Sequence, residues 1–151
     1  MHTITWHTKH FSELTGSEVH DILRLRVDVF VVEQRCVYAE VDGQDTEAVH
    51  VMGQAGDGEL VAYARILPPH GDGLPHIGRV VVHPEHRGQQ LGRALMHRTM
   101  AALEMLYGSR RSALAAQEYL VGFYNSFGFR AVGGSYLWDG IAHVDMEHDL
   151  A

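Results

Sequence analysis

Hydrophobic and polar positions follow two periods along this chain, and these periods predict strands and helices. Apolar residues three to four positions apart predict one helix from Thr15 to about Gln34 and another from Gly88 to about Leu106. Short apolar runs and alternating positions predict strands near Ile4, at residues 48–55, 59–67, 76–83 and 112–117, and in the C-terminal tail. The near-continuous apolar run at residues 76–83 indicates a central strand.

Turn and capping residues separate these elements. The segment Thr15-Gly-Ser-Glu18 is a capping box, which opens the first helix. The sequence Gly-Asp-Gly at 56–58 and the pair Asp139-Gly140 are typical of hairpin turns, and residues 118–127 predict a short helix. The resulting order, β-α-β-β-β-α-β-α-β-β, predicts a mixed α/β sheet. It does not alternate strictly enough for a doubly wound fold.

The composition is that of one globular domain with an acidic balance. The 151 residues carry 19 acidic and 12 basic side chains, which give a formal net charge of −7 at pH 7. This length is enough for one core and too short for two ordinary domains, so we expect a single domain over residues 1–151. The negative charge argues against nucleic acid as a partner, because that binding depends on Lys and Arg at phosphates. It leaves room for a local basic pocket that holds one phosphorylated small molecule.

Cysteine content and apolar runs indicate the compartment. Cys36 is the only cysteine, so the chain can form neither an internal disulfide nor a thiolate-rich zinc site. The N-terminal residues lack the apolar core of a signal peptide, and no apolar run is long enough to span a bilayer. We therefore expect a cytoplasmic protein with no membrane partner.

The end of the central strand and the start of the second helix form a candidate anion site. The first turn of a helix has unpaired N–H groups and a partial positive charge. Gly88 and Gly92 allow close backbone approach there, and Arg87 and Arg93 add two fixed charges. A diphosphate fits these features, and the same residues also fit a plain loop with a glycine-assisted helix start. The segment is neither a Walker A loop nor a G-x-G-x-x-G motif, which argues against a nucleoside triphosphate or NAD.

With a second motif, this loop resembles a known family. The pattern R-G-x-x-x-G follows V-x-V-x-P, and F-Y-N-S-F-G-F follows at residues 123–129. These motifs and the order of elements resemble the GNAT superfamily of acyl-CoA-dependent N-acyltransferases over the whole chain. The resemblance looks closest to its ElaA-type branch, on residues 26–45, 60–67, 77–82, 115–117 and 139–143. It implies an α/β (α+β) fold whose mixed, mostly antiparallel central sheet of six to seven strands is flanked by about three to four helices.

The resemblance implies that acetyl-CoA binds as a co-substrate. The backbone of Val80, Val81 and Val82 would pair with the pantetheine arm, and Gln117 stands where the family commonly has an asparagine that contacts the cofactor. The pyrophosphate would lie on the loop residues Arg87, Gly88, Gln89, Gln90, Gly92 and Arg93. Gln90 replaces the first glycine of the family's usual loop pattern, so a backbone donor there must act with a side chain attached.

Catalysis of this kind needs a proton acceptor and a proton donor. A primary amine is only about one part in a thousand neutral at pH 7, and only the neutral form attacks a thioester. Tyr124 matches the tyrosine that the family places beside the thioester sulfur, where a phenol can protonate the departing thiolate. The family often has a glutamate base in its fourth strand, and this chain has Gly78-Arg79 there. The resemblance therefore assigns no base.

Several groups are candidates for the base. Glu33 lies near the end of the first helix, in a region that borders the acceptor cleft of the fold it resembles, and His143 follows the last hairpin turn. Both are assigned here as candidate catalytic residues. His50, His76 and direct transfer to water are alternatives, and each of these side chains also fits a purely packed or solvated role.

Two further clusters suggest chemistry outside this resemblance. Four acidic residues between 35 and 47 suit either the attraction of a cationic amine or a solvated loop; they are Glu40, Asp42, Asp45 and Glu47. The pairs His7/His10 and His83/His86 have an i, i+3 spacing, but the sequence shows no third ligand at a telling distance. We therefore expect no metal.

These observations predict an N-acetyltransferase that moves an acetyl group from acetyl-CoA to a primary amine of a small molecule, peptide or protein. The transfer would be a direct attack in a ternary complex. The alternatives are a non-catalytic acyl-CoA-binding or sensing module of the same fold, and a metal-binding protein built on the 12 histidines. Members of the superfamily often form homodimers, and the sequence leaves both the oligomeric state and the acceptor open.

Overall fold

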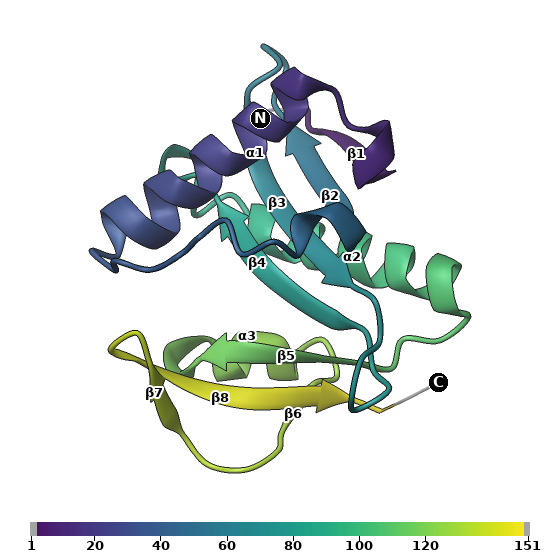
Figure 1. Cartoon of the computed structure of the whole chain (residues 1–151), viewed down its shortest axis with the longest axis vertical. Coiled ribbons are helices and arrows are strands. Elements are labelled where there is room, and N and C mark those ends of the chain that lie inside the picture. The colour runs from purple at the N-terminus through teal and green to yellow at the C-terminus, as the bar shows by residue number, and fades with distance from the viewer. Residues whose placement is uncertain (1–2, 150–151) are drawn as a thin grey trace.

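One mixed sheet organises the chain in a computed structural model that describes residues 3–149 (Figure 1). Its eight strands are β1 (Thr5–His10), β2 (Val49–Gln54), β3 (Leu60–Leu67), β4 (His76–Val82), β5 (Ser112–Gln117), β6 (Arg130–Ala131), β7 (Tyr136–Trp138) and β8 (Ile141–His148). The α-helices in this range are α1 (Gly16–Arg26), α2 (Leu91–Tyr107) and α3 (Val121–Asn125). None of these helices is long and apolar enough to cross a membrane.

The strands are ordered β1-β2-β3-β4-β5-β8-β6, and β7 also pairs with β8. All neighbouring strands are antiparallel except β4 and β5, which are parallel. The predicted fold class, a mixed and mostly antiparallel sheet flanked by helices, is therefore confirmed. Within the described residues, β6 is the strand that the pattern did not predict, because two residues cannot display a period.

The first helix begins at the predicted capping box. The Thr15 hydroxyl accepts a hydrogen bond from the Glu18 N–H at 3.1 Å, and the Glu18 carboxylate accepts one from the Thr15 N–H at 2.9 Å. Beyond α1 the helix continues as a wider, π-helical segment, Val27–Glu33, in which the Gln34 N–H donates to the Val29 carbonyl at 3.1 Å. The predicted end near Gln34 is thus confirmed. Such π-helical turns are rare and often lie at functional sites.

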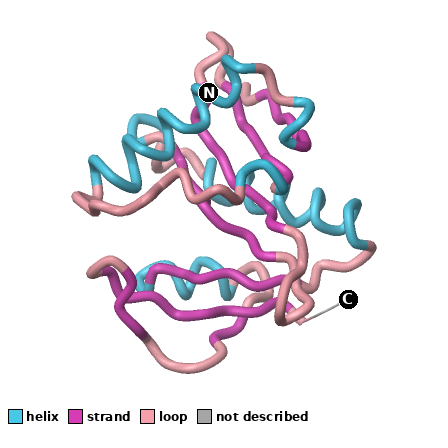
Figure 2. The backbone as a smooth tube through the Cα atoms, viewed as in Figure 1, coloured by secondary structure: helices cyan, strands magenta, loops and turns pink. Residues whose placement is uncertain are grey.

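Helices cover both faces of the sheet (Figure 2). On one face the apolar stripe of α1 packs with buried strand residues; this cluster contains Ile22, Leu25, Val29, Met52, Leu60, Tyr63 and Val81. On the other face α2 and α3 contribute to a larger cluster, which includes Leu95, Met96, Leu103, Leu114, Tyr124, Phe129 and Met146. Full burial of one such aliphatic or aromatic side chain stabilises the fold by about 1.5–3 kcal/mol.

The two parallel strands in the middle of the sheet diverge, and we call this divergence the fork. β4 and β5 share one pair of opposed residues, His76 and Ala113, at one end. From there they separate toward Val82 and Gln117, at the left of Figure 1. Beyond the shared pair, the β4 backbone has no strand partner on its β5 side among the described residues.

On its other side β4 pairs with β3 but contains an irregularity. The register between the two strands shifts between Tyr63 and Arg65, opposite Arg79 and Val80. Arg79 has a φ of 51°, an unusual left-handed conformation for a residue other than glycine. A bulge of this kind bends a strand and re-aims its backbone groups. In this sheet it lies at the fork, on the strand whose edge is unpaired.

Candidate active site

Three segments that are distant in sequence meet at the open end of the fork. The Arg87 guanidinium, in the loop after β4, donates from both terminal nitrogens to the carboxylate of Glu33, at 2.8 Å each. The amide of Gln117, at the end of β5, donates to the side-chain oxygen of Gln34 at 3.4 Å. The end of the first helix therefore spans the fork and contacts both of its arms.

The β4 edge offers backbone groups to an extended ligand. Val81 is buried, while Val80 and Val82 are partly buried. Since residues 3–149 supply no strand partner on the β5 side of this segment, its N–H and C=O groups can pair with an extended chain as a further strand would. This is where the sequence placed the residues that contact the pantetheine arm.

The loop between β4 and α2 leaves the start of α2 open to an anion. Gln90 precedes the helix, and its side chain makes no capping hydrogen bond. Gly88 has a φ of 81° and Gln90 a φ of 60°, both in the left-handed region. Gln90 therefore keeps the conformation that a glycine adopts without strain, and for a residue with a side chain this costs about 1–2 kcal/mol. The free N–H groups and the helix dipole favour a phosphate here.

Arg93, in the first turn of α2, is held by two residues that follow α3. Arg93 donates to the Ser126 hydroxyl at 3.1 Å, and its guanidinium lies 4.8 Å from the centre of the Phe127 ring. Its side chain is exposed, so it can reach a ligand at the helix start without leaving a buried position. Gln89 and Gly88 are also exposed. Gly92 is partly buried, and a Cβ on it would lie 3.8 Å from the Phe123 ring, so the start of α2 packs against α3.

Tyr124 follows Phe123 on α3 and is only 6% exposed. Its ring meets the rings of Phe123 and Phe129 in T-shaped contacts, with centroid distances of 5.2 and 6.2 Å. Burial raises the pKa of the Tyr124 phenol above its ordinary value of 10. The phenol therefore keeps its proton at neutral pH, which is the state that a proton donor requires.

The structure makes Glu33 a poor candidate for the base. Both of its carboxylate oxygens accept hydrogen bonds from Arg87. Those hydrogen bonds lower the pKa of Glu33 below its ordinary value. A carboxylate with a lowered pKa accepts a proton less readily, so the Glu33–Arg87 pair opposes the role that the sequence suggested.

His143 presents a proton-accepting nitrogen. Its Nδ1 lies 2.8 Å from the Ile141 carbonyl, which can only accept, so Nδ1 carries the proton of the neutral ring and Nε2 keeps a lone pair. The half-buried ring contacts those of Tyr136 and Trp138, at centroid distances of 6.1 and 5.4 Å. His143 pairs directly with Gln117 across β5 and β8, so both side chains lie on one face at the open end of the fork. Of the two candidate bases, the geometry favours His143.

Three of the four acidic residues, Glu40, Asp42 and Asp45, are paired with arginines, which corrects both readings of the sequence for these three. Glu47 is exposed, with one carboxylate oxygen 3.4 Å from His70. Arg26 is fully buried and donates from Nε to Glu40 at 2.5 Å and from Nη1 to Asp45 at 2.7 Å. Glu40 is only 4% exposed and also accepts a hydrogen bond from the Tyr38 hydroxyl at 2.7 Å. Its carboxylate is therefore occupied from two sides.

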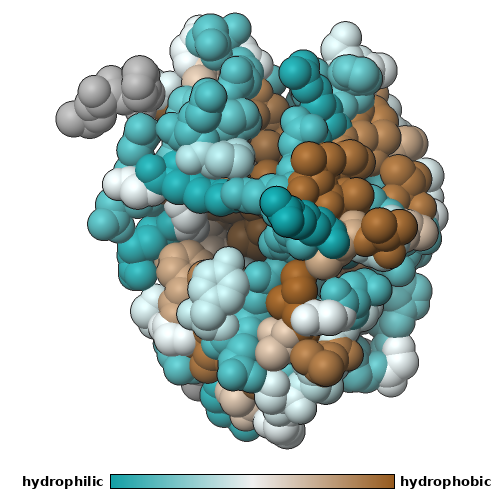
Figure 3. Space-filling model, turned by 90° about the vertical axis from the view of Figure 1, so that its left-hand side faces the viewer, coloured by the Kyte–Doolittle hydropathy of each residue, from teal (hydrophilic) through white to brown (hydrophobic). Residues whose placement is uncertain are grey.

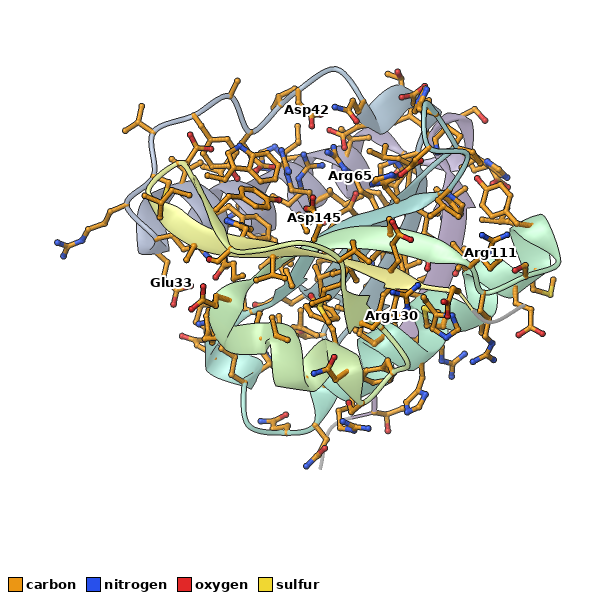
Figure 4. The ribbon with its side chains drawn as sticks, turned by 90° about the horizontal axis from the view of Figure 1, so that it is seen from below. Glu33, Asp42, Arg65, Arg111, Arg130 and Asp145 are labelled. Carbon is orange, nitrogen blue, oxygen red and sulfur yellow. The ribbon has the colours of Figure 1, made fainter. Side chains whose placement is uncertain are left out.

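Two further arginines complete this ion-pair network. Arg65 of β3 donates to Asp42 at 2.6 and 3.0 Å and to Asp45 at 2.9 Å, and Figure 4 shows Arg65 and Asp42 on the same side of the sheet. Arg79, at the β4 bulge, donates to Glu40 at 2.9 Å. Although burial opposes the shift, the hydrogen bonds from Arg65 lower the pKa of Asp42 to about 2. The network fixes residues 38–45 across β3 and β4.

Exposed hydrophobic side chains border the open end of the fork instead. Val32 and Val37 come from the end of the first helix and the segment after it, and Leu137 and Trp138 come from the last hairpin, which Cys36 contacts at Asp139. Figure 3 faces this end of the molecule and shows hydrophobic side chains gathered around a hollow. The surface next to the candidate site is therefore partly apolar.

Sequence reasoning missed the residues that build this arrangement. Arg26 and Arg65 carry the network, and Gln34 bridges to Gln117. A signal for the first two was present, because Arg26 falls on the apolar stripe of its helix and Arg65 lies within a strand of apolar residues. A charge at a core position indicates a buried partner. No comparable signal marked Gln34.

The strand fork and the helix start beside it can be compared with known proteins. A family model described as "Acetyltransferase (GNAT) domain" matches residues 18–150. The chain belongs to this GNAT family.

Relatives and solved structures extend the match over nearly the whole chain. Protein ElaA of Escherichia coli is 42% identical over 150 residues, which cover 97% of each chain. A UPF0039 protein of Schizosaccharomyces pombe is 42% identical over 94% of this chain and 95% of its own. The crystal structure of an acyl-CoA N-acyltransferase from Pseudomonas aeruginosa has a TM-score of 0.92 and 43% identity, and covers 97% of this chain and 99% of that one. The resemblance to the ElaA-type branch is confirmed.

Proposed function

We propose that this protein is an N-acetyltransferase that transfers an acetyl group from acetyl-CoA to a primary amine of a small molecule, peptide or protein. The observation that carries the proposal is the fork, in which a β4 edge without a strand partner in residues 3–149 is joined by residues 83–90 to the uncapped start of α2. A linear thioester cofactor with a diphosphate at one end suits such a surface. The proposed protein is one domain over residues 1–151 that acts in the cytoplasm, without metal in the transfer and without nucleic acid or membrane as a partner.

In this proposal each part of the cofactor has its own contacts. The pantetheine arm lies along Val80, Val81 and Val82, and Gln117 faces it from the other arm of the fork. The pyrophosphate lies at the start of α2, on the residues Arg87, Gly88, Gln89, Gln90, Gly92 and Arg93. In the free protein Arg87 already donates to Glu33 and, from Nε, to the Val82 carbonyl at 3.2 Å. Diphosphate binding therefore exchanges Glu33 for a phosphate.

The transfer needs one proton acceptor and one proton donor. The neutral amine attacks the thioester carbonyl, and backbone N–H groups at the β4 bulge stabilise the oxyanion that forms. Nε2 of His143, or water, takes the proton from the amine nitrogen. The carbon–sulfur bond then breaks, the acetyl group remains on the nitrogen, and the Tyr124 phenol protonates the thiolate of CoA.

The exposed hydrophobic residues at the open end of the fork indicate which class of amine the protein accepts. Since the acidic residues of segment 38–45 are neutralised by arginines, they do not provide a free negative surface for a polycation. An amine that carries an apolar group next to its nitrogen fits these hydrophobic residues better. We include this acceptor class in the proposal.

A second candidate function is a non-catalytic acyl-CoA-binding module. The observation that favours it is the state of the nearby carboxylates, because Glu33 is held by Arg87 and Glu40 by Arg26 and Arg79. In the protein without cofactor, neither carboxylate is available to act as a base. His143 as the base removes this objection.

A binding assay and a turnover assay separate these functions. The first measures thermal unfolding with acetyl-CoA, CoA or ATP, and the second measures thiol release over a panel of apolar amines and polyamines. The proposal expects stabilisation by both CoA species, less by ATP, and thiol release with apolar amines. Stabilisation without thiol release on any amine favours the binding module. The absence of stabilisation by either CoA species contradicts both functions.

A further inference from the structure

Two histidines and one glutamate converge at the foot of the loop that leads to α2. His83 follows β4 directly, and His86 ends the short 3₁₀ turn Pro84–His86. Glu59 lies just before β3. We call these three residues the His-Glu cluster. It lies on the β3 side of the end of β4, where Glu59 is the shared partner of both histidines.

The pairing of β3 with β4 brings the third member to the other two. The His83 N–H donates to the Val61 carbonyl of β3 at 2.8 Å, which fixes the end of β4 beside the start of β3. In a 3₁₀ turn, residues three apart lie on the same side, and the rings of His83 and His86 meet in a T-shaped contact at a centroid distance of 5.6 Å. The sequence showed the histidine pair but not Glu59, which lies far from it along the chain.

The distances suit a small metal ion. Nε2 of His83 and Nε2 of His86 lie 3.7 and 3.8 Å from the same carboxylate oxygen of Glu59, and one ligand atom from each of the three residues lies within 4.8 Å of the others. Bonds of about 2.0–2.1 Å in a tetrahedral zinc site place neighbouring ligand atoms about 3.3–3.4 Å apart. To reach this spacing, each Nε2 atom must move only a few tenths of an ångström closer to the Glu59 oxygen.

The donor set and exposure indicate the class of metal. Two imidazoles and one carboxylate favour zinc and its neighbours in the first transition row over magnesium or calcium, which prefer oxygen ligands. The side chains of His86 and His83 are 17% and 28% exposed and that of Glu59 is 47% exposed. Solvent can therefore supply the fourth ligand. We propose that Glu59, His83 and His86 form a binding site for one divalent transition-metal ion of the zinc type.

Metal binding requires one rearrangement. Nδ1 of His83 accepts a hydrogen bond from the Glu85 N–H at 3.1 Å, so the neutral ring carries its proton on Nε2. For Nε2 to bind a metal, the ring proton must move to Nδ1 and the Glu85 amide must turn to water, which its exposed position allows. The bound metal then joins the root of the Arg87 loop to β3.

The test is a cobalt titration of the full-length protein, freed of any histidine tag and dialysed against a chelator. Four-coordinate cobalt has visible absorption bands, so the titration reports both stoichiometry and geometry, and zinc is added afterwards as a competitor. We expect one equivalent of cobalt, displaced by zinc. Glu59→Gln and His86→Gln should each weaken binding by more than about tenfold, because even outer-shell changes weaken metal sites by about 10–100-fold.

His76→Gln is the matched control. His76 lies 2.8 Å from Asp72 and so forms an exposed histidine–carboxylate pair without a second imidazole. This variant should bind cobalt as the unaltered protein does, and circular dichroism should show all three variants folded. Binding without defined stoichiometry overturns the proposal, as does binding that survives both Glu59→Gln and His86→Gln or that falls equally in His76→Gln. Because the readout is metal binding alone, its result is independent of the acetyltransferase assays.

Discussion

The Glu33–Arg87 pair ties one candidate base to one candidate phosphate ligand. The two side chains are 40% and 45% exposed, and exposed pairs of this kind stabilise by about 0.2–1 kcal/mol. If diphosphate must displace Glu33, this energy opposes cofactor binding. If Glu33 is instead the base, its removal opposes catalysis. The two roles of Glu33 therefore predict different kinetic changes.

We predict that Glu33→Gln lowers the KM for acetyl-CoA and leaves kcat nearly unchanged. The loss of a competing charge worth up to about 1 kcal/mol corresponds to an effect of up to about fivefold. Steady-state kinetics with acetyl-CoA varied, together with calorimetric Kd values for CoA, measure it. Raised salt should shrink the difference between the two proteins, because salt screens exposed charges. A tenfold or greater fall in kcat would instead make Glu33 the base.

Tyr124 gives a second prediction at the scale of one residue. Tyr124→Phe keeps the ring and its contacts with Phe123 and Phe129 but removes the proton donor. We expect kcat to fall by about 10²-fold or more, the usual contribution of general acid catalysis, with a change of less than about 1 kcal/mol in the free energy of unfolding. Thiol-release assays and urea unfolding measure the two quantities. Tyr119→Phe, at a neighbouring side chain that is 78% exposed, is the control and should leave kcat unchanged.

At the scale of elements, the sequence predicted local structure well because local signals determine it. The capping box at Thr15, the apolar stripe of α2 and the turn at Asp139-Gly140 each act within a few residues, and all three elements form. Helix α2 begins at Leu91 and not at the predicted Gly88, because Gly88 and Gln90 have positive φ values. The φ values of 51° and 78° at Asp139 and Gly140 are those that a two-residue hairpin turn needs.

Charged segments were harder to interpret, because their partners come from elsewhere in the chain. The carboxylates of Asp42 and Asp45 are paired with Arg26 and Arg65, which lie on a helix and on another strand. Charge and spacing alone describe a solvated loop equally well. The candidate site shows the same limit, since its loop motif was visible in the sequence but the pairing of Arg87 with Glu33 required the fold.

The ion-pair network predicts a pH dependence of stability. The pKa of Asp42 is about 2 in the folded protein, lower than its ordinary value of 3.8, so its contribution to stability is present above about pH 4. This contribution is lost as the pH falls from about 4 toward 2. Urea unfolding at several pH values should show that Asp42→Asn is less stable than the unaltered protein at pH 6 and that the difference shrinks toward pH 2. A difference that stays constant over this range would place the effect of the substitution outside the ionisation of Asp42.

At the scale of the whole molecule, the fork divides the sheet into two parts with different support. The strands β1 to β4 form one part and β5 to β8 the other. The two parts are joined at the shared pair of His76 and Ala113, and the Ala113 N–H also donates to the Pro75 carbonyl at 3.0 Å. The core cluster that contains α2 and α3 residues includes strand residues of both parts. The two parts are thus held at the closed end of the fork and by one face of the sheet, and their open end is bridged by the Gln34–Gln117 hydrogen bond.

A ligand that lies in the fork should therefore protect the β4 arm and the adjacent start of α2 from hydrogen exchange. We predict that saturating acetyl-CoA slows amide exchange in peptides that cover residues 78–82 of β4 and the start of α2, because the pantetheine arm would pair with the first and the pyrophosphate with the second. Acetyl-CoA at about 100 times its Kd adds roughly 2.7 kcal/mol to the free energy of unfolding, which slows exchange throughout the protein. Exchange in β1, which is remote from the fork, is the control for this uniform effect. Adenosine 3′,5′-diphosphate, a fragment of the cofactor without the pantetheine arm, should leave residues 78–82 unprotected. Protection confined to the start of α2 with the whole cofactor would show that β4 does not pair with the ligand, and the fork would then have no part in binding.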